Sequence, residues 1–263
     1  MRAKIILDGW KPKVSYADVT TAIREAGAIV TNRSPDIGVV VGGDGVFSRV
    51  GSIESIPLLF VGTRSQSATG SKAYLAAVQF DQLTDALRQI ESGRYRVEES
   101  RRLEVLKNGR KIGAVFTDVY MQRGADSNCI RYRVKVTGKD FGIEEAAIGD
   151  GVVVSTAAGS TGYYSYLDRI REGEFDQTGH TEFKSDQVGI CHVLPTYMER
   201  TGSEGHPVRY TVTWGSRVEL SITRPADARL YGLGGTRLGV RISASDMVAI
   251  MPSPETTKVI ALT

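Results

Sequence analysis

Two different spacings of hydrophobic residues follow one another along the chain. In about the first ninety residues, short apolar runs alternate with helical patterns, which is typical of βα units and a mostly parallel sheet. Residues 37–41 and 57–61 are such runs, and they predict strands buried on both faces. Residues 80–92 instead predict a helix, because their apolar positions recur every three or four residues. That apolar stripe consists of Leu83, Ala86, Leu87 and Ile90.

In the rest of the chain, apolar and polar residues alternate with a period of two. This alternation is typical of antiparallel strands with one buried and one solvated face. The clearest example places Ile130, Tyr132, Val134 and Val136 on one side and Arg131, Arg133 and Lys135 on the other. The pair Asn108-Gly109 lies between two apolar segments and predicts a two-residue hairpin turn.

The change of period predicts a two-domain protein. We expect an α/β domain with a mostly parallel sheet at residues 1–95 and a β-rich domain at residues 96–263. The C-terminal tail either stays in the β-rich domain or returns to the first. Within the first domain, Ser15 is expected to cap a helix that Gly27 ends.

Composition and charge narrow the classes of function. With 41% hydrophobic and 24% charged residues, the chain has the composition of a soluble globular protein. No apolar run approaches the roughly 20 residues that span a bilayer, and no long apolar signal segment opens the chain, so we expect a cytoplasmic protein without a membrane partner. A net charge of +3 is too small to indicate a nucleic-acid partner. Cys129 and Cys191 are expected to be free thiols.

Histidine and cysteine positions do not predict a metal site. His180, His192 and His206 lack the spacing of metal ligands, so they are interpreted as structural or surface groups. The chain also lacks the Gly-x-x-x-x-Gly-Lys-Ser/Thr sequence of P-loop enzymes.

The sharpest local motif is Gly42-Gly43-Asp44-Gly45, directly after the apolar run 37–41. Glycines at the carboxyl end of a parallel strand let the backbone approach a ligand, and the N-terminus of a following helix favours phosphate. A carboxylate is unfavourable beside phosphate, so Asp44 is expected either to hold Mg²⁺ or to accept a proton from a hydroxyl. The simpler interpretation is a glycine turn with a solvated aspartate.

A second motif covers residues 149–163. There a short apolar strand leads into a turn of small and hydroxyl residues that ends in Tyr163. Such a turn suits a flat base or a phosphate, and an aromatic ring can pack on the base. Alternatively, Ser160 or Thr161 only caps a helix that reaches Ile170, and Tyr163 belongs to the core.

Taken together, these motifs resemble those of the NAD kinases. The resemblance rests on Gly42-Gly43-Asp44-Gly45, then Thr117-Asp118, then Asp150-Gly151 followed by Ser155-Thr156 and the turn from Gly159 to Tyr163, in the family's order and approximate spacing. It extends from about Ile5 to the C-terminus. The family's fold, an α/β nucleotide-binding domain followed by a β-rich domain, agrees with the change of period.

The resemblance implies specific roles for these residues. Asp44 would be the catalytic carboxylate beside the adenosine ribose 2′-hydroxyl of NAD, and Gly42, Gly43 and Gly45 would cradle the phosphates of ATP. Mg²⁺ is the implied cofactor. The phosphoryl donor would be ATP or polyphosphate, and a homodimer or homotetramer is expected. The residues implied for NAD binding are Thr117, Asp118, Asp150, Ser160, Thr161, Gly162 and Tyr163.

Several departures from the family's pattern indicate a distant relationship to the NAD kinases. Thr117 stands where Asn is usual, Gly162 where Ala is usual, and no late Asp-Gly occurs near Leu233-Gly234. Phosphorylation of NAD to NADP is therefore the expected activity, with two alternatives left open. One is a kinase of a lipid or nucleoside hydroxyl on the same scaffold, and the other is a catalytically weak nucleotide-binding relative.

Overall fold

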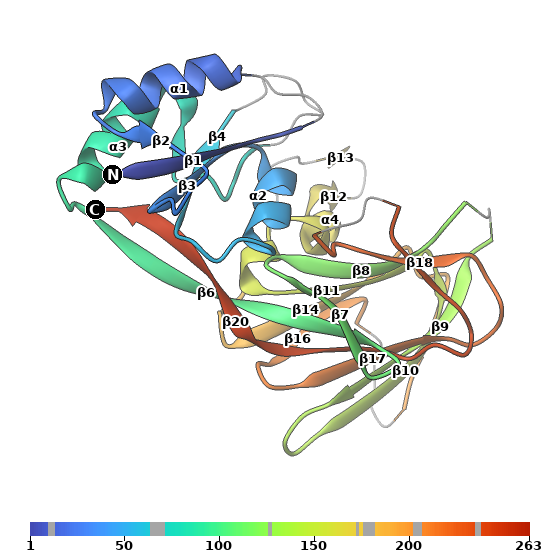
Figure 1. Cartoon of the computed structure of the whole chain (residues 1–263). Helices are drawn as coiled ribbons and strands as arrows, with labels where there is room; N and C mark the ends of the chain where they lie inside the picture. Colours follow the sequence, from blue (N-terminus) through green and yellow to red (C-terminus); the bar gives the residue numbers. More distant parts are fainter. Residues whose placement is uncertain are drawn as a thin grey trace. The chain divides into compact units, whose positions relative to one another are not determined.

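The computed structural model of the chain divides into two compact units (Figure 1). The first unit consists of Met1–Ser100 and Thr256–Thr263, and the second of Arg101–Glu255. The structure describes residues 1–9, 14–63, 72–125, 128–171, 174–175, 182–201, 207–234 and 238–263. His180 and His206 lie outside these described residues.

The first unit contains a parallel sheet with helices. Its strands pair in the order β20-β4-β3-β1-β2, and β5 pairs with β4. The strands are β1 (Arg2–Leu7), β2 (Ile29–Val30), β3 (Ile37–Gly42), β4 (Leu58–Gly62), β5 (Val78–Gln79) and the end of β20 (Val248–Leu262). The helices are α1 (Tyr16–Glu25), α2 (Asp44–Gly51), η1 (Phe80–Gln82) and α3 (Leu83–Glu91).

Local sequence signals explain these elements. The Ser15 side chain accepts a hydrogen bond from the backbone N–H of Asp18 and so caps α1, as predicted. The apolar stripe predicted for residues 80–92 is buried at all four positions in α3. Both helices pack on the sheet in one apolar core that also includes Val39, Leu59 and Ile260.

The described residues of the second unit form two large antiparallel sheets. One has the strand order β15-β10-β9-β17-β20, and the other has the order β16-β14-β11-β8-β18-β19. The strands of the first sheet are β9 (Ile130–Thr137), β10 (Gly142–Gly149), β15 (Tyr197–Arg200), β17 (Arg217–Ile222) and residues 248–250 of β20. Those of the second are β8 (Asp118–Arg123), β11 (Gly151–Ser155), β14 (Gln187–Val193), β16 (Arg209–Thr213), β18 (Ala228–Tyr231) and β19 (Val240–Ile242).

Shorter elements complete this unit. A hairpin joins β6 (Tyr95–Lys107), which begins in the first unit, to β7 (Arg110–Val115). After β11 come η2 (Ala157–Gly159), η3 (Tyr163–Ser165), α4 (Tyr166–Arg169) and the small pair β12 (Ile170–Arg171) and β13 (Glu174–Phe175).

The predicted strand signals are confirmed. Residues of β9 alternate strictly between buried and exposed, and the buried set enters the core of the second unit. Asn108 and Gly109 form the predicted turn with φ angles of 52° and 78°, the combination that a two-residue hairpin requires. The α/β plus β-rich organisation is therefore confirmed, and both cysteines are free thiols.

One predicted element is wrong. The expected helix from Ser160 or Thr161 to Ile170 is replaced by one 3-10 turn, Tyr163–Ser165, and the four-residue helix Tyr166–Arg169. The interruption lies at Gly162, whose ψ of −132° is not helical. Its carbonyl instead accepts hydrogen bonds from Ser165 Oγ at 2.9 Å and Arg169 Nη2 at 2.8 Å.

Candidate functional site

The glycine motif of the first unit lies where a buried strand turns into a helix. All six residues of β3 are buried, and the strand ends at Gly42. Gly43 is the N-cap of α2 with an extended backbone, and Asp44 is the first residue of the helix. The first N–H groups of a helix lack partners within it, so this corner presents donors that suit an anion.

Asp44 is held in place by a backbone group from a distant part of the same unit. Its Oδ1 atom accepts a hydrogen bond from the N–H of Leu75 at 2.9 Å, and the side chain is half-buried. A carboxylate fixed in this way at the carboxyl end of a parallel strand can accept a proton or bind a cation.

Packing fixes the helix that carries Asp44. Phe47 of α2 is fully buried and stacks on Phe60 of β4, with ring centroids 4.8 Å apart. At the other end of α2, the buried hydroxyl of Thr257 donates to the carbonyl of Gly51 at 2.6 Å. The corner is therefore supported by the core, which is what a preorganised site requires.

A second corner forms in the other unit, where two segments 40 residues apart in sequence meet. Thr156 donates its hydroxyl to the carbonyl of Phe116 at 2.6 Å and its N–H to the carbonyl of Thr117 at 2.7 Å. Gly159 lies so close that a Cβ there would be 2.5 Å from the Thr117 oxygen. Only glycine allows this approach, and it brings the hydroxyl-rich turn beside Asp118.

Asp118 is the centre of this second corner. Its carboxylate accepts hydrogen bonds from the hydroxyl of Thr117 and the backbone N–H of Tyr163. Burial raises the pKa of Asp118 to about 6, against the lowering effect of these two donors. A Cβ placed on Gly162 would be 3.7 Å from Asp118 Oδ2, so a larger residue there would face the carboxylate directly.

Three tyrosine rings pack on one another beside the strand that carries Asp118. Tyr120 packs edge-on against Tyr163 and stacks on Tyr231, with centroid distances of 5.4 and 5.5 Å. Gln122 donates a hydrogen bond to the hydroxyl of Tyr163. Sequence reasoning missed Tyr120, Gln122 and Tyr231, although the alternation along β8 places Asp118, Tyr120 and Gln122 on one face.

Asp150 lies away from Asp118. The pairing of β8 with β11 matches Asp118 with Ser155 at one end and Gln122 with Gly151 at the other. Asp150 adjoins the second end, where its Oδ1 is 2.9 Å from Nε of Arg123. Five residues of strand correspond to roughly 16 Å, so the two carboxylates occupy separate places along the same ladder.

The remaining predicted residues differ in exposure. The Ser160 side chain is buried, while Thr161 and Gly162 are half-buried beside Tyr163. Ser160 donates its N–H to the carbonyl of Ala157, within a turn rather than at a helix start. Of the predicted set in this unit, Thr117, Asp118, Gly162 and Tyr163 are brought together directly.

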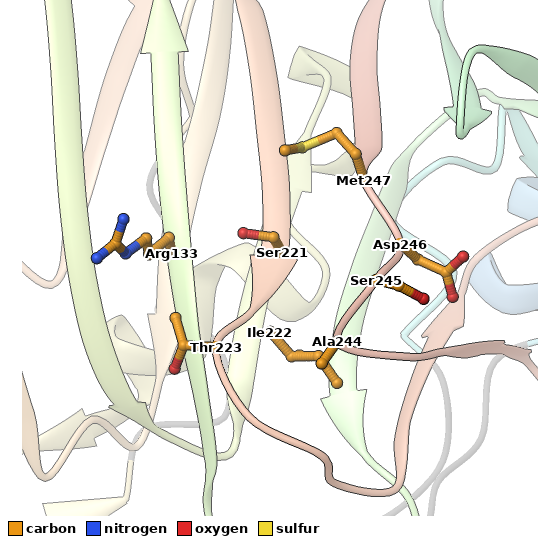
Figure 2. A pocket seen from close by; sticks show the side chains of 8 residues that line it. All are labelled: Arg133, Ser221, Ile222, Thr223, Ala244, Ser245, Asp246 and Met247. Atoms are coloured by element: carbon orange, nitrogen blue, oxygen red, sulfur yellow. The ribbon is translucent and has the colours of Figure 1, made fainter.

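A pocket elsewhere in the second unit is not a competing site. It is open to solvent and has a volume of about 420 Å³. Figure 2 shows the side chains that line it. The carboxylate of Asp246 accepts hydrogen bonds from the Asn108 side chain and the Ser243 N–H. Arg133 forms an ion pair with Glu144, with an N–O distance of 3.7 Å. The lining residues are Arg133, Ser221, Ile222, Thr223, Ala244, Ser245, Asp246 and Met247, and they include no predicted site residue.

The described residues place limits on metal binding and membrane crossing. Among them, no group of three or more His, Cys, Asp or Glu side chains could hold a metal ion. In the same part of the chain, no helix has the length and apolar character needed to cross a membrane.

Comparison with known sequences gives a consistent set of relatives. No protein-family model matches the chain. An NAD kinase of Thiobacillus denitrificans is 30% identical over 203 residues, which are 74% of this chain and 61% of that protein. An NAD kinase of Methanopyrus kandleri is 30% identical over 131 residues, 49% of this chain and 44% of that protein. The chain thus spans about half the length of curated relatives it matches.

Solved structures share the fold over the whole chain. The yeast NADH kinase complexed with NADH superimposes with a TM-score of 0.71 at 14% identity, covering 100% of this chain and 83% of that one. An NAD kinase from Archaeoglobus fulgidus in complex with ATP gives a TM-score of 0.67 at 16% identity, covering 100% and 94%.

Proposed function

This chain is a distant member of the NAD kinase family, and we propose that it phosphorylates the adenosine ribose 2′-hydroxyl of NAD to give NADP, with ATP as donor. The observation that carries the proposal is the meeting of two separate motifs at Asp118 in the second unit. A carboxylate beside a glycine and a tyrosine is suited to a base with an exocyclic amine and to a ribose.

The first unit supplies the phosphate-binding and proton-accepting groups in this proposal. Gly42, Gly43 and Gly45 form the corner at the start of α2, where backbone N–H groups favour phosphate oxygens. Asp44 hydrogen-bonds the attacking hydroxyl and takes its proton as the bond to phosphorus forms. Such general-base assistance typically contributes a factor on the order of 10² to 10⁴.

The residues of this corner offer one carboxylate to a divalent cation and not a complete set of protein ligands. Mg²⁺ in kinases is usually held by one or two carboxylates and the substrate phosphates, rather than by a full protein cage. Asp44 offers such a carboxylate, and the described residues contain no larger acidic cluster. When bound, Mg²⁺ neutralises charge on the phosphates, while Asp44 orients the hydroxyl.

The second unit supplies the dinucleotide-binding groups. We assign the adenine end of NAD to Asp118, Gly162 and Tyr163, with Thr161 beside them and Ser160 supporting the turn. Thr117 acts through Asp118, because its hydroxyl donates to that carboxylate. Asp150 is assigned to the nicotinamide end, which agrees with its separate place on the same strand ladder.

The expected cellular setting follows from the family. We expect the protein to act in the cytoplasm as a homodimer or homotetramer, with neither nucleic acid nor membrane as partner. Sedimentation or light scattering of the purified chain measures the oligomeric state.

A coupled assay tests the proposal. Purified protein is incubated with NAD, Mg²⁺ and either ATP or polyphosphate, and NADP is detected with an NADP-specific dehydrogenase. NAD affinity is measured separately by calorimetry, and Asp44→Asn is the matched control. NADP formation that Asp44→Asn abolishes supports the proposal. NAD binding without product indicates a weak nucleotide-binding relative, and ATP consumption only with a lipid or nucleoside acceptor indicates another kinase.

A further inference from the structure

A buried polar network connects the two sheets of the second unit, and none of the roles above uses it. His192 of β14 and Tyr132 of β9 are fully buried, and Glu145 of β10 is 1% exposed. His192 Nε2 lies 3.1 Å from Glu145 Oε2, and His192 Nδ1 lies 2.9 Å from the Tyr132 hydroxyl. The same hydroxyl donates to the carbonyl of Gly151 at 2.7 Å. The chain of contacts therefore runs from Glu145 to the residue that follows Asp150.

Glu145 is in its ionised form in this network. Arg200 donates to its Oε1 from Nε at 2.9 Å and from Nη2 at 2.5 Å, and the hydroxyl of Tyr210 donates to Oε2 at 2.6 Å. Burial alone would raise the pKa of Glu145, but the donors on His192, Tyr210 and Arg200 outweigh burial and lower it. An ionised carboxylate only accepts hydrogen bonds, so Nε2 of His192 must carry a proton.

Counting protons then fixes the second nitrogen of the imidazole ring. The Tyr132 hydroxyl has one proton, and this proton is directed to the carbonyl of Gly151, which can only accept. A lone pair of the Tyr132 oxygen consequently faces Nδ1, and that contact is a hydrogen bond only if Nδ1 also carries a proton. All these contacts are satisfied together when His192 is an imidazolium ion paired with Glu145.

Loss of the Nδ1 proton would redirect the Tyr132 hydroxyl. Nδ1 would become an acceptor, the hydroxyl would donate to it, and the Gly151 carbonyl would lose this donor. Gly151 has little freedom to compensate, because its φ is 149° and a Cβ there would lie 1.9 Å from the Met121 oxygen. The neighbouring Asp150 is tied by its N–H to the carbonyl of Val193 at 2.9 Å.

We propose that His192 is a positioning residue that acts through the Tyr132 hydroxyl to fix the Gly151 carbonyl, and thereby the corner that carries Asp150. The effect of this corner on NAD rests on the proposed function, whereas the hydrogen-bond arrangement does not.

Other ionisable groups around the ring are accounted for. Cys191 precedes His192 on β14, and burial raises the pKa of its thiol to about 12, so the thiol stays neutral. The hydroxyl of Tyr166, from α4, donates to the backbone carbonyl of His192 at 2.9 Å rather than to the ring. The pKa of the Tyr132 hydroxyl is raised mainly by burial and next by the negative charge of Glu145. The negative charge of Asp150 raises the same pKa to a smaller extent. Arg200 and Tyr210 reach the ring only through Glu145.

Two NMR measurements on the full chain test the arrangement without any assay of activity. The chain has three histidines, so ¹⁵N-histidine labelling gives three ring systems, and His192→Gln identifies the one of interest. The chain has four Gly-Val steps, so pairing ¹³C-carbonyl glycine with ¹⁵N-valine isolates the Gly151 carbonyl in a small spectrum, where Val152→Ile identifies it. We expect both ring nitrogens of His192 to be protonated near neutral pH, and the Gly151 carbonyl resonance to move in Tyr132→Phe.

Tyr164→Phe is the matched control. It removes another buried hydroxyl of the same unit, one that points to the carbonyl of Tyr210 rather than to the corner. The Gly151 resonance should stay in place in this variant. An Nδ1 atom of His192 that carries no proton, or an unchanged Gly151 resonance in Tyr132→Phe, overturns the proposal.

NAD kinetics extend the test to function. Tyr132→Phe lacks the hydroxyl that bonds the Gly151 carbonyl, so its KM for NAD should rise about fivefold, corresponding to one hydrogen bond, while kcat stays constant. A protein that neither binds NAD nor makes NADP defeats the proposed function, and the NMR measurements still decide the positioning role of His192. An unchanged KM for NAD in Tyr132→Phe overturns that role.

Discussion

The two glycine-rich corners of this protein are built in opposite ways. In the first unit, Gly42, Gly43 and Asp44 are neighbours in the chain, and one buried strand followed by one helix places them. In the second unit, Asp118 meets Gly162 and Tyr163 only because Thr156 ties its segment to residues 116–117. The first corner is a local structure and the second is a tertiary one.

Asp44 and Asp118 also differ in the surroundings of their carboxylates. Asp44 starts a helix, where the helix dipole and one backbone N–H from Leu75 support a negative charge. Burial disfavours the negative charge of Asp118 and raises the pKa of this carboxyl group to about 6. A tertiary site can thus impose a cost on its functional group, and binding sites commonly retain such costs.

Asp44→Asn should give the largest effect. The amide keeps an Oδ1 atom that can accept from the N–H of Leu75, so the corner should stay folded, but the side chain can no longer take a proton. NADP formation should fall by a factor on the order of 10² to 10⁴, with nucleotide affinity within about tenfold of the wild type. Steady-state kinetics and calorimetry measure both. Unchanged turnover would remove Asp44 from catalysis.

Substitutions at Gly162 and Asp118, in the second corner, should weaken NAD binding. Gly162→Leu would push a side chain toward Asp118 Oδ2, and Asp118→Ala would remove the acceptor itself. A lost hydrogen bond to a buried partner costs about 1 to 3 kcal/mol, so NAD affinity should fall roughly ten- to a hundredfold in each variant. Calorimetry gives the affinities and circular dichroism confirms folding. Folded variants that bind NAD as well as the wild type would contradict the assignment.

Asp118→Asn should stabilise the protein in a pH-dependent way. Folding raises the pKa of Asp118 from 3.8 to about 6, so the stability contributed by its protonated form is present below about pH 4 and is lost as the pH rises through 6. The neutral amide avoids that loss. Urea unfolding should show a gain of about 3 kcal/mol at pH 8 that disappears near pH 4. A gain that is equal at both pH values would show that burial does not perturb Asp118.

Gly45→Ala should give the smallest effect. A Cβ at Gly45 would meet nothing within 4 Å, and alanine is favoured over glycine in a helix, so unfolding should cost about 0.5 to 1 kcal/mol more. Gly159→Ala is the contrasting variant, because its Cβ would collide with the Thr117 oxygen and destabilise the protein by about 1 to 3 kcal/mol. Equal effects in thermal unfolding would mean that the two corners do not differ in packing.

Short-range signals allowed much of the fold to be predicted. The cap at Ser15, the apolar stripe of α3 and the turn at Asn108-Gly109 each depend on residues within a few positions of one another. The same holds for the strand and helix around Asp44. His192 was interpreted as a structural or surface group, and its complete burial among hydrogen-bond partners leaves only the structural alternative.

The longer-range features were beyond sequence reasoning. The break in the expected helix at Gly162 was not predicted. The Gly162 carbonyl accepts a hydrogen bond from the side chain of Arg169, and this contact depends on the folded arrangement rather than on a local helical pattern. Tyr120 and Tyr231 were missed as neighbours of Asp118, since their stacking depends on the register between β8 and β18.

By itself, the sequence determined the kinds of elements, the two halves and the residues capable of the chemistry, because hydrophobic period, capping and turn preferences act over a few residues. Only the tertiary structure decided which of those residues meet. It joined Asp118 to the turn at Gly162, separated Asp150 along the same ladder, and placed His192 between Glu145 and Tyr132. Strand register and the pairing of buried polar groups fix these meetings, and both depend on partners far apart in the chain.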